Sequence, residues 1–482
     1  MRHRERGQQE TARDYDPTPI RVDHTLAMAE FVGAANGISE AQLRQLEPQL
    51  QRADEQMHSW RTAADGGWWA LPYDMAAVAE VKGLAKQLKE WCRDALVVGL
   101  GDAALGIRAL RQALLHPSHN YFPLGRRHYH SRLFIADSLD PDNLYGMLDG
   151  LELKRLAVNV ISTSGETPET LALLAFIYQI LANRLDPAQA RESCVVTTTV
   201  APSTLRRLAV QEGFPLLTVP ADLPGGFGLL SVQGLFPAAL AGIDINGLLA
   251  GARFMDQHLR EAPLSENAAY RLAAIYYLAH GRQGRRQQLI MPCAHSLLGL
   301  AHWYSRLWST CLEPASSQGE GHWPGRASAA AGIAEHYRLA AARMANAAHV
   351  FVTFWEVEQF QHQITVPSPF AQGQDLAYLH GQPLARVLAA ARQATAWHLA
   401  EAGCPSLTIK IPAVNAFTLG QLILLLQTTV VALGALAGID PFARRSVDDL
   451  RQTTCGLLGR AEDAAAAQAL AHLGQTKSQY VV

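Results

Sequence analysis

A long uncharged segment constrains the fold of this chain more than any other feature. No charged residue lies between Lys410 and Asp440, and residues 418–439 read TLGQLILLLQTTVVALGALAGI. A stretch of this length is nearly long enough to cross a bilayer. Polar residues such as Gln421 and Gln427 interrupt it, however, and no belt of Trp and Tyr flanks it. We therefore expect a helix buried in a large protein core, with no membrane as partner.

Composition agrees with a chain that builds large cores. Hydrophobic residues make up 49% and charged residues 17% of 482 residues, which excludes a disordered protein. The formal net charge of -2 gives no electrostatic reason to expect nucleic acid. The six cysteines contain no CxxC pair, so neither a disulfide framework nor a metal site is expected. The N-terminus is charged and lacks the apolar run of a secretory signal.

Short apolar runs that alternate with helical stretches predict two α/β lobes. Strand, helix, strand in this rhythm is typical of a parallel sheet covered on both faces. The expected strands are 95–100, 132–137, 156–162, 194–200 and 215–220, then 287–292, 349–357 and 405–411. Residues 313–328, rich in Gly, Ser and Pro, are expected to form a long loop. The predicted division is a disordered N-terminus (1–20), a helical segment (21–91), a first lobe (92–245), a helical bridge (246–284), a second lobe (285–440) and a C-terminal segment (441–482).

The segment STSGETPET, residues 162–170, follows a predicted strand and precedes a predicted helix. Hydroxyls and free backbone N–H groups at a helix N-terminus accommodate a phosphate through hydrogen bonds and the positive end of the helix dipole. Pro168 fits the first helical turn. A well-capped helix with a Ser-rich entry explains the pattern equally well.

The segment VGLGDAALG, residues 98–106, places Gly99 and Gly101 directly after a predicted strand. Glycines in such a turn let the backbone approach a ligand closely. The spacing is not the G-x-G-x-x-G fingerprint, so a dinucleotide site is weakly supported. We expect Asp102 to be the N-cap of the next helix.

Together these segments resemble the glucose-6-phosphate isomerase family, whose members have two sugar isomerase (SIS) domains. VVGLGDAALG is similar to the family's V-G-I-G-G-S-x-x-G turn, and STSGETPET to its phosphate loop S-K-S-G-T-T-x-E-T. PGGFGLLSVQGLFPAALAGID, WYSRLWSTCL, AAGIAEHYRLAAARM and FTLGQLILLLQTTVVALGALAGIDPF match later family segments in the same order. The resemblance implies an α/β fold of two SIS-type three-layer αβα lobes with parallel sheets, plus helical N-terminal and C-terminal segments.

The family resemblance also implies a reaction: reversible conversion of glucose 6-phosphate to fructose 6-phosphate in glycolysis and gluconeogenesis. It implies no metal or organic cofactor and a cytoplasmic homodimer whose sites use residues from both chains, so that pairing with a paralogue is also open. The reaction opens the sugar ring and moves a proton between C1 and C2 through an enediol. It requires a carboxylate base, an acid/base for ring opening and a cation near the developing oxyanion.

The family's catalytic positions hold other residues in this chain. The glutamate that acts as the catalytic base in the family aligns with Thr310, and the histidine that opens the sugar ring aligns with Tyr337. The arginine of the family's G-G-R motif aligns with Gly226, and its C-terminal lysine aligns with Arg451. A threonine hydroxyl cannot act as the base near pH 7. The neighbouring His336 and the loop residues Glu313 and Glu320 are the possible substitutes, although each is more often a solvated or packed side chain.

The ligand-binding positions transfer better. Ser162, Ser164 and Thr167 occupy the family's phosphate-binding hydroxyl positions, with Thr163 in place of the usual lysine and Glu166 in place of a threonine. A carboxylate beside a phosphate repels it unless the carboxylate points away or pairs with an arginine. The backbone around the sugar is expected to come from Gly99, Gly101, Asp102 and Gly225.

Three hypotheses follow. The leading one is a catalytically degenerate family member that binds glucose 6-phosphate or fructose 6-phosphate and has a regulatory or scaffolding role. The alternative is an active aldose–ketose isomerase with relocated catalytic residues, using His336 and a loop glutamate. The third is a different phosphorylated ligand held by Arg444, Arg445 and Arg451, for which a solvated basic turn is the simpler interpretation.

Overall fold

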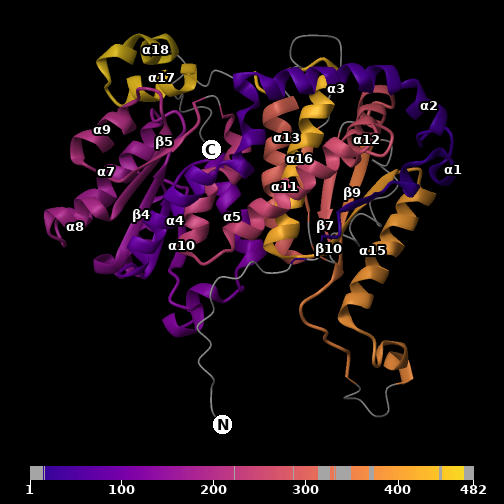
Figure 1. The fold of residues 1–482 in the computed structure, drawn as a ribbon, viewed down its shortest axis with the longest axis horizontal. Coiled ribbons are helices and arrows are strands. Elements are labelled where there is room, and N and C mark those ends of the chain that lie inside the picture. Colours follow the sequence, from indigo (N-terminus) through magenta and orange to yellow (C-terminus); the bar gives the residue numbers. More distant parts are fainter. Residues whose placement is uncertain are drawn as a thin grey trace, which may run out of the picture.

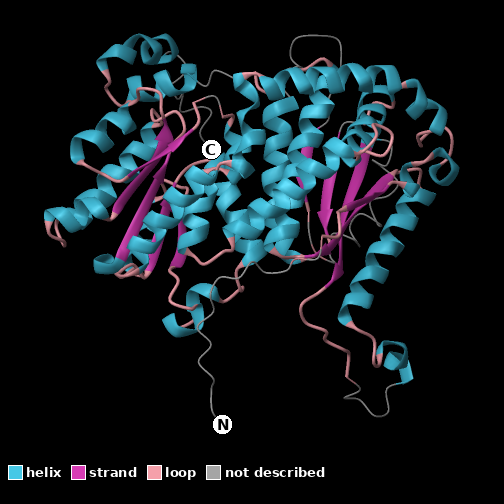
Figure 2. Cartoon of the chain, viewed as in Figure 1, coloured by secondary structure: helices cyan, strands magenta, loops and turns pink. Residues whose placement is uncertain are grey.

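Two sheets, one parallel and one parallel except for its edge strand β1 (Arg21–Asp23), organise the molecule with helices between and around them (Figure 1). The computed structural model describes residue 15 and residues 17–221, 223–285, 287–312, 326–330, 332, 349–367, 374–443 and 448–471. Figure 2 shows the two sheets on the two sides of a helical centre. The predicted α/β class with two αβα lobes is confirmed, while the predicted disordered N-terminus lies largely outside the described residues.

The first lobe contains a parallel sheet of order β3-β2-β4-β5-β6. Its strands are β2 (Asp94–Val98), β3 (Arg132–Ala136), β4 (Leu156–Ile161), β5 (Cys194–Thr199) and β6 (Leu216–Val219), which confirms the five strands predicted there. The outer face is covered by α6 (Pro141–Asp149), α7 (Pro168–Ala182), α8 (Pro187–Glu192) and α9 (Thr204–Glu212). The inner face is covered by α4 (Met75–Lys89), α5 (Asp102–Leu114) and α10 (Val232–Leu240). Because both faces are buried, the strands read as continuous apolar runs.

The second lobe contains a sheet of order β1-β10-β9-β7-β8. Its parallel strands are β7 (Gln287–Pro292), β8 (Arg326–Ala329), β9 (Val350–Gln359) and β10 (Ser406–Ala413), and β1 (Arg21–Asp23) adds to β10 in the antiparallel direction. The expectation that 313–328 is wholly a loop is wrong where β8 forms. β8 is a short edge strand without an apolar run, and β1 has only three residues, so neither gave a strand signal.

Helix α16 (Ala416–Ala437) lies in the helical centre and is the uncharged segment of the sequence. It packs against α3 (Glu47–Thr62), α11 (Ile245–Glu261), α12 (Ala268–Tyr276) and α13 (Leu298–Leu312). Of the helices in the described ranges it alone is long and apolar enough to cross a membrane, and 94% of its apolar window is buried inside the protein. The prediction of a buried core helix is confirmed.

The polar residues of α16 find partners inside the protein. The side chain of Gln421 accepts a hydrogen bond from the backbone N–H of Ile20 at 3.2 Å and donates one to the carbonyl of Thr18 at 3.3 Å. Gln427 donates to the carbonyl of Phe227 in the first lobe at 3.4 Å. Buried amides need such partners, which a lipid phase would not supply. The remaining helices are α1 (Ala29–Val32), α2 (Glu40–Gln45), α15 (Leu384–Glu401), α17 (Asp448–Leu457) and α18 (Ala464–Leu470).

Two glycines allow α16 and α11 to cross closely. A Cβ on Gly251 would lie 1.7 Å from the carbonyl oxygen of Phe417, and a Cβ on Gly420 would lie 1.8 Å from that of Leu248. No side chain fits at these distances, so the two backbones are in direct contact.

We predict that Gly251→Ala forces the α11 and α16 backbones apart and lowers the free energy of unfolding by about 3 kcal/mol. The matched control is Gly83→Ala on the exposed face of α4, where a Cβ meets nothing within 4 Å. That change should raise stability by about 1 kcal/mol through helix propensity. Urea denaturation measures both; equal effects of the two variants would contradict the close crossing.

Candidate active site

Two loops leave the first sheet side by side at its carboxyl edge, where open α/β sheets bind ligands. Val98 of β2 pairs with Val160 of β4, so the turn at residues 99–102 and the loop at 162–167 start next to each other. A Cβ on Gly99 would lie 3.4 Å from the carbonyl oxygen of Ile161, so the two segments are in contact. The glycine-containing turn at 99–102 and the hydroxyl-containing loop at 162–167 therefore border one candidate site.

Three hydroxyl groups converge in the loop at 162–167. The hydroxyl oxygen of Ser162 lies 3.5 Å from that of Ser164 and 3.3 Å from that of Thr167, and the last two are 3.3 Å apart. The backbone N–H of Gly165 donates to the Ser162 hydroxyl at 3.1 Å. The α7 helix starts at Pro168, directly behind these groups. Rotatable hydroxyls at a helix N-terminus can donate to the oxygens of a phosphate.

The loop geometry depends on Gly165 and its contact with the next loop of the sheet. Gly165 has a φ of 64°, and a Cβ there would lie 2.2 Å from the hydroxyl oxygen of Ser203. The N–H of Leu205 donates to the carbonyl of Gly165 at 3.0 Å. Only glycine fits this left-handed position against Ser203, so the glycine of the motif is required by packing.

Glu166 points away from the hydroxyl groups. Its carboxylate accepts hydrogen bonds from the backbone N–H of Thr204 at 2.6 Å and from the Thr204 hydroxyl at 2.9 Å. Thr204 is the first residue of α9, so the negative charge stabilises the N-terminus of that helix. The repulsion expected between Glu166 and a bound phosphate is thereby reduced, although Thr163, at the family's lysine position, supplies no positive charge.

Asp102 does not cap α5, contrary to the sequence prediction. Gly101 is the N-cap, because its φ of 60° makes the turn into the helix, and Asp102 is the first helical residue. The Asp102 carboxylate instead accepts a hydrogen bond from Nε of Arg306 on α13 at 3.2 Å. Its other oxygen lies 2.7 Å from the position that a Cβ on Gly225 would take. The carboxylate therefore faces the glycine backbone predicted to border the sugar.

The positions of the family's arginine and base are occupied by uncharged groups. A Cβ on Gly226 would lie 2.7 Å from a methyl group of Leu307, so Leu307 of α13 fills the space beside Gly226. The hydroxyl of Thr310 is buried and has no hydrogen-bond partner among the described residues. Burial raises the pKa of the neighbouring Cys311 thiol, and the carboxylates of Asp102 and Asp440 raise it further. The position of the family's glutamate therefore holds a buried hydroxyl and no carboxylate.

Arg306 contacts the candidate site through Asp102, and the sequence did not point to it. It precedes Thr310 by four residues on α13, so both lie on one face of the helix. The sequence feature that could have pointed to Arg306 is its place in the segment WYSRLWSTCL, one helical turn before Thr310, the position of the family's base. A single arginine in an amphipathic helix is usually a surface residue, and its proximity to Asp102 depends on how α13 packs against α5.

The remaining candidates are only partly described. Arg451 lies on α17, which contacts α7, the helix behind the hydroxyl groups (Figure 1). The other substitutes and basic residues lie outside the described residues: Glu313, Glu320, His336, Tyr337, Arg444 and Arg445.

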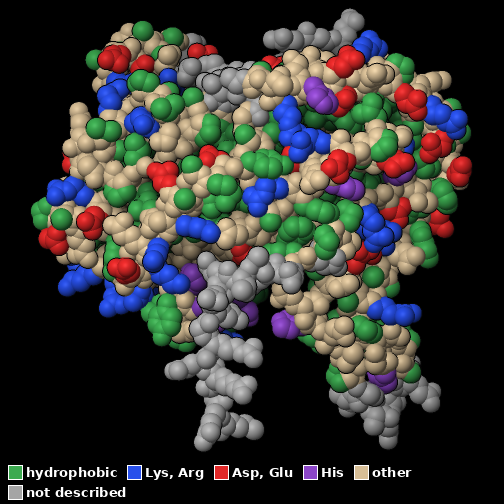
Figure 3. All heavy atoms as spheres, viewed as in Figure 1, with side chains coloured by type: hydrophobic (Ala, Val, Ile, Leu, Met, Phe, Trp, Pro, Cys, Tyr) green, Lys and Arg blue, Asp and Glu red, His purple; other side chains and the backbone are tan. Residues whose placement is uncertain are grey.

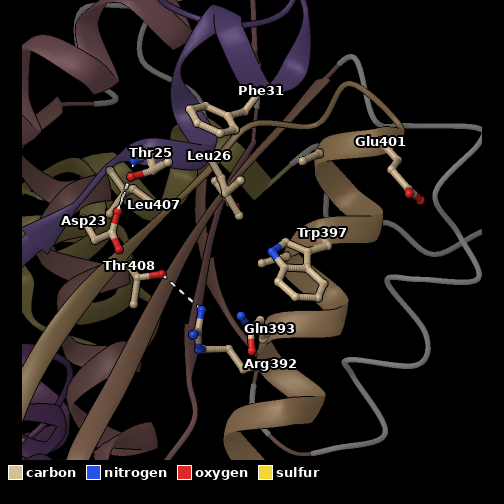
Figure 4. A pocket seen from close by; sticks show the side chains of 13 residues that line it. Asp23, Thr25, Leu26, Phe31, Arg392, Gln393, Trp397, Glu401, Leu407 and Thr408 are labelled. Carbon is tan, nitrogen blue, oxygen red and sulfur yellow. Dashed lines mark hydrogen bonds between the residues drawn. The ribbon is translucent and has the colours of Figure 1, made fainter.

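A hollow lies on the second lobe, away from these motifs. It has a volume of about 520 Å³ and lies between the N-terminal segment, α15 and β10. Trp397 and Phe31 border it, and Arg392 reaches the Thr408 hydroxyl at its base (Figure 4). It shares no residue with the loops at 99–102 and 162–167, so the motifs of the sequence do not point to it. Across the face drawn in Figure 3, acidic and basic side chains are intermixed.

Comparison with known proteins identifies relatives along most of the chain. Residues 77–308 match the family model described as phosphoglucose isomerase. A glucose-6-phosphate isomerase from Carboxydothermus hydrogenoformans is 30% identical over 397 residues, covering 82% of this chain and 85% of that protein. A probable glucose-6-phosphate isomerase from Haloarcula marismortui is 31% identical over 445 residues, covering 92% of this chain and 96% of its own.

Solved structures show the same fold. A hypothetical protein from Thermus thermophilus superposes with a TM-score of 0.80 at 26% identity, covering 92% of this chain and 100% of its own. A glucose-6-phosphate isomerase from Chlamydia trachomatis gives a TM-score of 0.73 at 16% identity, covering 91% of each chain.

The role of Glu166 gives a test of the loop geometry. Glu166→Ala removes two hydrogen bonds and a favourable charge at the start of α9, so it should lower the free energy of unfolding by about 1 kcal/mol. Glu192→Ala, at the exposed end of α8, should change it by less than about 0.5 kcal/mol. Urea unfolding curves of the two variants decide; equal stabilities would show that Glu166 does not support α9.

Proposed function

Because the chain belongs to the glucose-6-phosphate isomerase family, we propose that it binds a phosphorylated hexose at the 162–167 loop but does not perform the family's isomerisation. The observation that carries the proposal is the convergence of Ser162, Ser164 and Thr167 within 3.5 Å of one another at the start of α7. The relatives' names print glucose 6-phosphate, so the proposed ligand is glucose 6-phosphate or fructose 6-phosphate, the other sugar of the reaction that the family resemblance implies.

The orientation of Glu166 supports phosphate binding. A carboxylate beside the hydroxyl groups would repel a phosphate dianion, but both oxygens of Glu166 are engaged by Thr204 at the start of α9. The phosphate would be bound by hydroxyl and backbone donors and by the positive end of the α7 dipole. With Thr163 in place of a lysine, we expect weaker phosphate binding than a charged loop provides.

The proposal of lost catalysis depends on the replaced catalytic positions. Thr310 stands where the family has its base, Leu307 fills the space beside Gly226, and Tyr337 replaces the ring-opening histidine. Losing a general acid or base typically costs about 10² to 10⁴ in rate. Losing one preorganised oxyanion donor costs about 10² to 10³. A protein of this kind serves as a phosphosugar-responsive regulator or scaffold, as a cytoplasmic homodimer or paired with a paralogue.

The alternative is an active isomerase with a relocated catalytic set, which the names of the relatives favour. In that case His336, Glu313 or Glu320 would supply the proton transfers from a part of the chain outside the described residues.

The first prediction concerns binding. Fructose 6-phosphate should raise the melting temperature, because at 100 times Kd a ligand stabilises the native state by about 2.7 kcal/mol. The double variant Ser164→Ala with Thr167→Ala should abolish that rise. The matched control replaces Ser59 and Thr62, which have the same residue types and spacing on the exposed face of α3; it should retain the full rise. An unchanged rise in the loop variant would exclude the loop as the phosphate site.

The second prediction concerns turnover. In a coupled assay that reads glucose 6-phosphate formed from fructose 6-phosphate, the wild type should be no faster than the Ser164→Ala and Thr167→Ala variant. Turnover clearly above that variant would overturn the proposed loss of catalysis and favour the alternative. His336→Ala would then show whether the rate depends on His336.

A further inference from the structure

A hollow with two aromatic side chains at its rim lies on the second lobe, between α15 and the N-terminal segment (Figure 4). Trp397 of α15 and Phe31 of α1 border it, and they are 56% and 51% exposed. Ala396 and Ala400, one helical turn apart on α15, also line it, and their small side chains leave room for a ligand. The volume of about 520 Å³ is in the range of small-molecule sites. The hollow therefore has the size of a ligand site and two aromatic surfaces that the protein leaves half exposed.

The sheet beside the hollow presents polar and charged side chains instead of an apolar face. Asp23 and Arg21 are two residues apart on β1, so their side chains lie on one face. In the register of the sheet they lie opposite Thr408 and Lys410 of β10, and Glu356 of β9 lies opposite Lys410. A helix that covers a sheet normally packs on apolar residues, so packing alone does not account for this charged row.

A smaller hollow of about 410 Å³ adjoins the first along this row. The two hollows share Asp23, Thr25 and Phe31, and the smaller one adds Arg21 and Lys410. A ligand in the first hollow can thus extend from the aromatic rim to the charged row.

The charges of this row cancel one another. Ion pairs join Arg392 with Glu356 at 3.1 Å, Lys410 with Asp23 at 3.0 Å and Arg21 with Glu358 at 2.5 Å. Glu401, the other charged residue that lines the first hollow, points away from it (Figure 4). The site therefore favours a ligand without net charge, because an ion would lose hydration without gaining a net attraction.

Arg392 has unused hydrogen-bond donors beside the aromatic rim. Its Nε donates to Glu356 at 3.1 Å, its Nη1 donates to the Thr408 hydroxyl at 3.5 Å, and its Nη2 lies 3.1 Å from Glu356. A guanidinium carries five N–H groups, so at least two of them have no partner among the described residues. Oδ2 of Asp23 lies 3.0 Å from Nζ of Lys410 and retains a lone pair for a further donor. Donors and an acceptor thus lie next to the aromatic surfaces.

We propose that this hollow is a second ligand site, which binds a nucleoside. The base stacks on Trp397 and presents its polar edge to Arg392 and Asp23, while the ribose extends toward Arg21 and Lys410 in the adjoining hollow. The two hollows share no residue with the loops at 99–102 and 162–167, so the inference goes beyond the proposed function and stands without it.

A nucleoside matches each property of the two hollows. Stacking of a base on an aromatic side chain strengthens binding about tenfold or more. The edge of a base carries donors and acceptors side by side, and an arginine can donate two N–H groups to the acceptors of a purine. Ribose hydroxyls both donate and accept, which suits a row of paired cations and carboxylates. A nucleoside also has no net charge, unlike a nucleotide or the sugar phosphate proposed for the loop.

Calorimetric titration with adenosine and guanosine tests the proposal, because neither probe has a phosphate to place at the 162–167 loop. At least one of the two should bind. Trp397→Ala should weaken that binding about tenfold, and Trp397→Phe, which keeps an aromatic ring, should weaken it less. Arg392→Lys keeps the charge beside Glu356 but loses the planar set of donors, so it should weaken binding about fivefold.

The matched control is Phe176→Ala, which removes an aromatic side chain of similar exposure, 49%, from α7 in the other lobe. It should leave the affinity unchanged. Indole is the control probe, since it offers an aromatic ring with one N–H and no ribose. It should bind about tenfold more weakly than the nucleoside, because it cannot use the donors of Arg392.

Binding of neither nucleoside to the wild type would overturn the inference, and so would an equal affinity for indole, which indicates an unspecific apolar surface. Unchanged affinity in Trp397→Ala would exclude this hollow as the site. The double variant Ser164→Ala with Thr167→Ala should bind the nucleoside as the wild type does; a loss there would place the nucleoside at the loop and overturn the inference. Should Arg392→Lys not fold, Trp397→Ala decides alone. The proposed function is tested separately, with fructose 6-phosphate, and holds or fails independently.

Discussion

The direct contact between α11 and α16 is the constraint on which the rest of the structure depends. Gly251 and Gly420 bring the two helix backbones together, and α16 then contacts helices from the N-terminal segment to the second lobe. The polar residues of α16 connect it to other segments by hydrogen bonds. Gln421 binds the chain next to β1, and Gln427 binds the carbonyl of Phe227, beside the glycines of the site. A single buried helix thus positions both a sheet edge and a site loop.

The candidate site combines a loop that keeps the family's hydroxyl residues with a changed centre. In the loop, Gly165 fits closely against Ser203, and Glu166 supports α9, so substitutions in the family motif are absorbed by neighbouring elements. At the centre, Leu307 fills the space beside Gly226, and Arg306, from the same helix, reaches Asp102.

The strands that could be predicted are those that form a clear apolar run in the sequence. The five strands of the first lobe are buried on both faces, so each reads as an apolar run, whereas β8 and β1 are short strands at the sheet edges and carry no such run. The sequence predicted Asp102 as the N-cap because aspartate is common at the residue directly before a helix. Gly101, with its positive φ, is the N-cap instead, so the Asp102 carboxylate accepts a hydrogen bond from Arg306 rather than from the helix backbone.

The sequence by itself determined the family, the order of strands and helices, and the burial of α16, because each is encoded in apolar periodicity or in motifs read along the chain. It also placed Ser162, Ser164 and Thr167 on one loop. Only the tertiary structure decided where the charges of Glu166, Asp102 and Arg306 point. Those directions depend on contacts between residues 38 and 204 positions apart, and such contacts leave no local pattern in a single sequence.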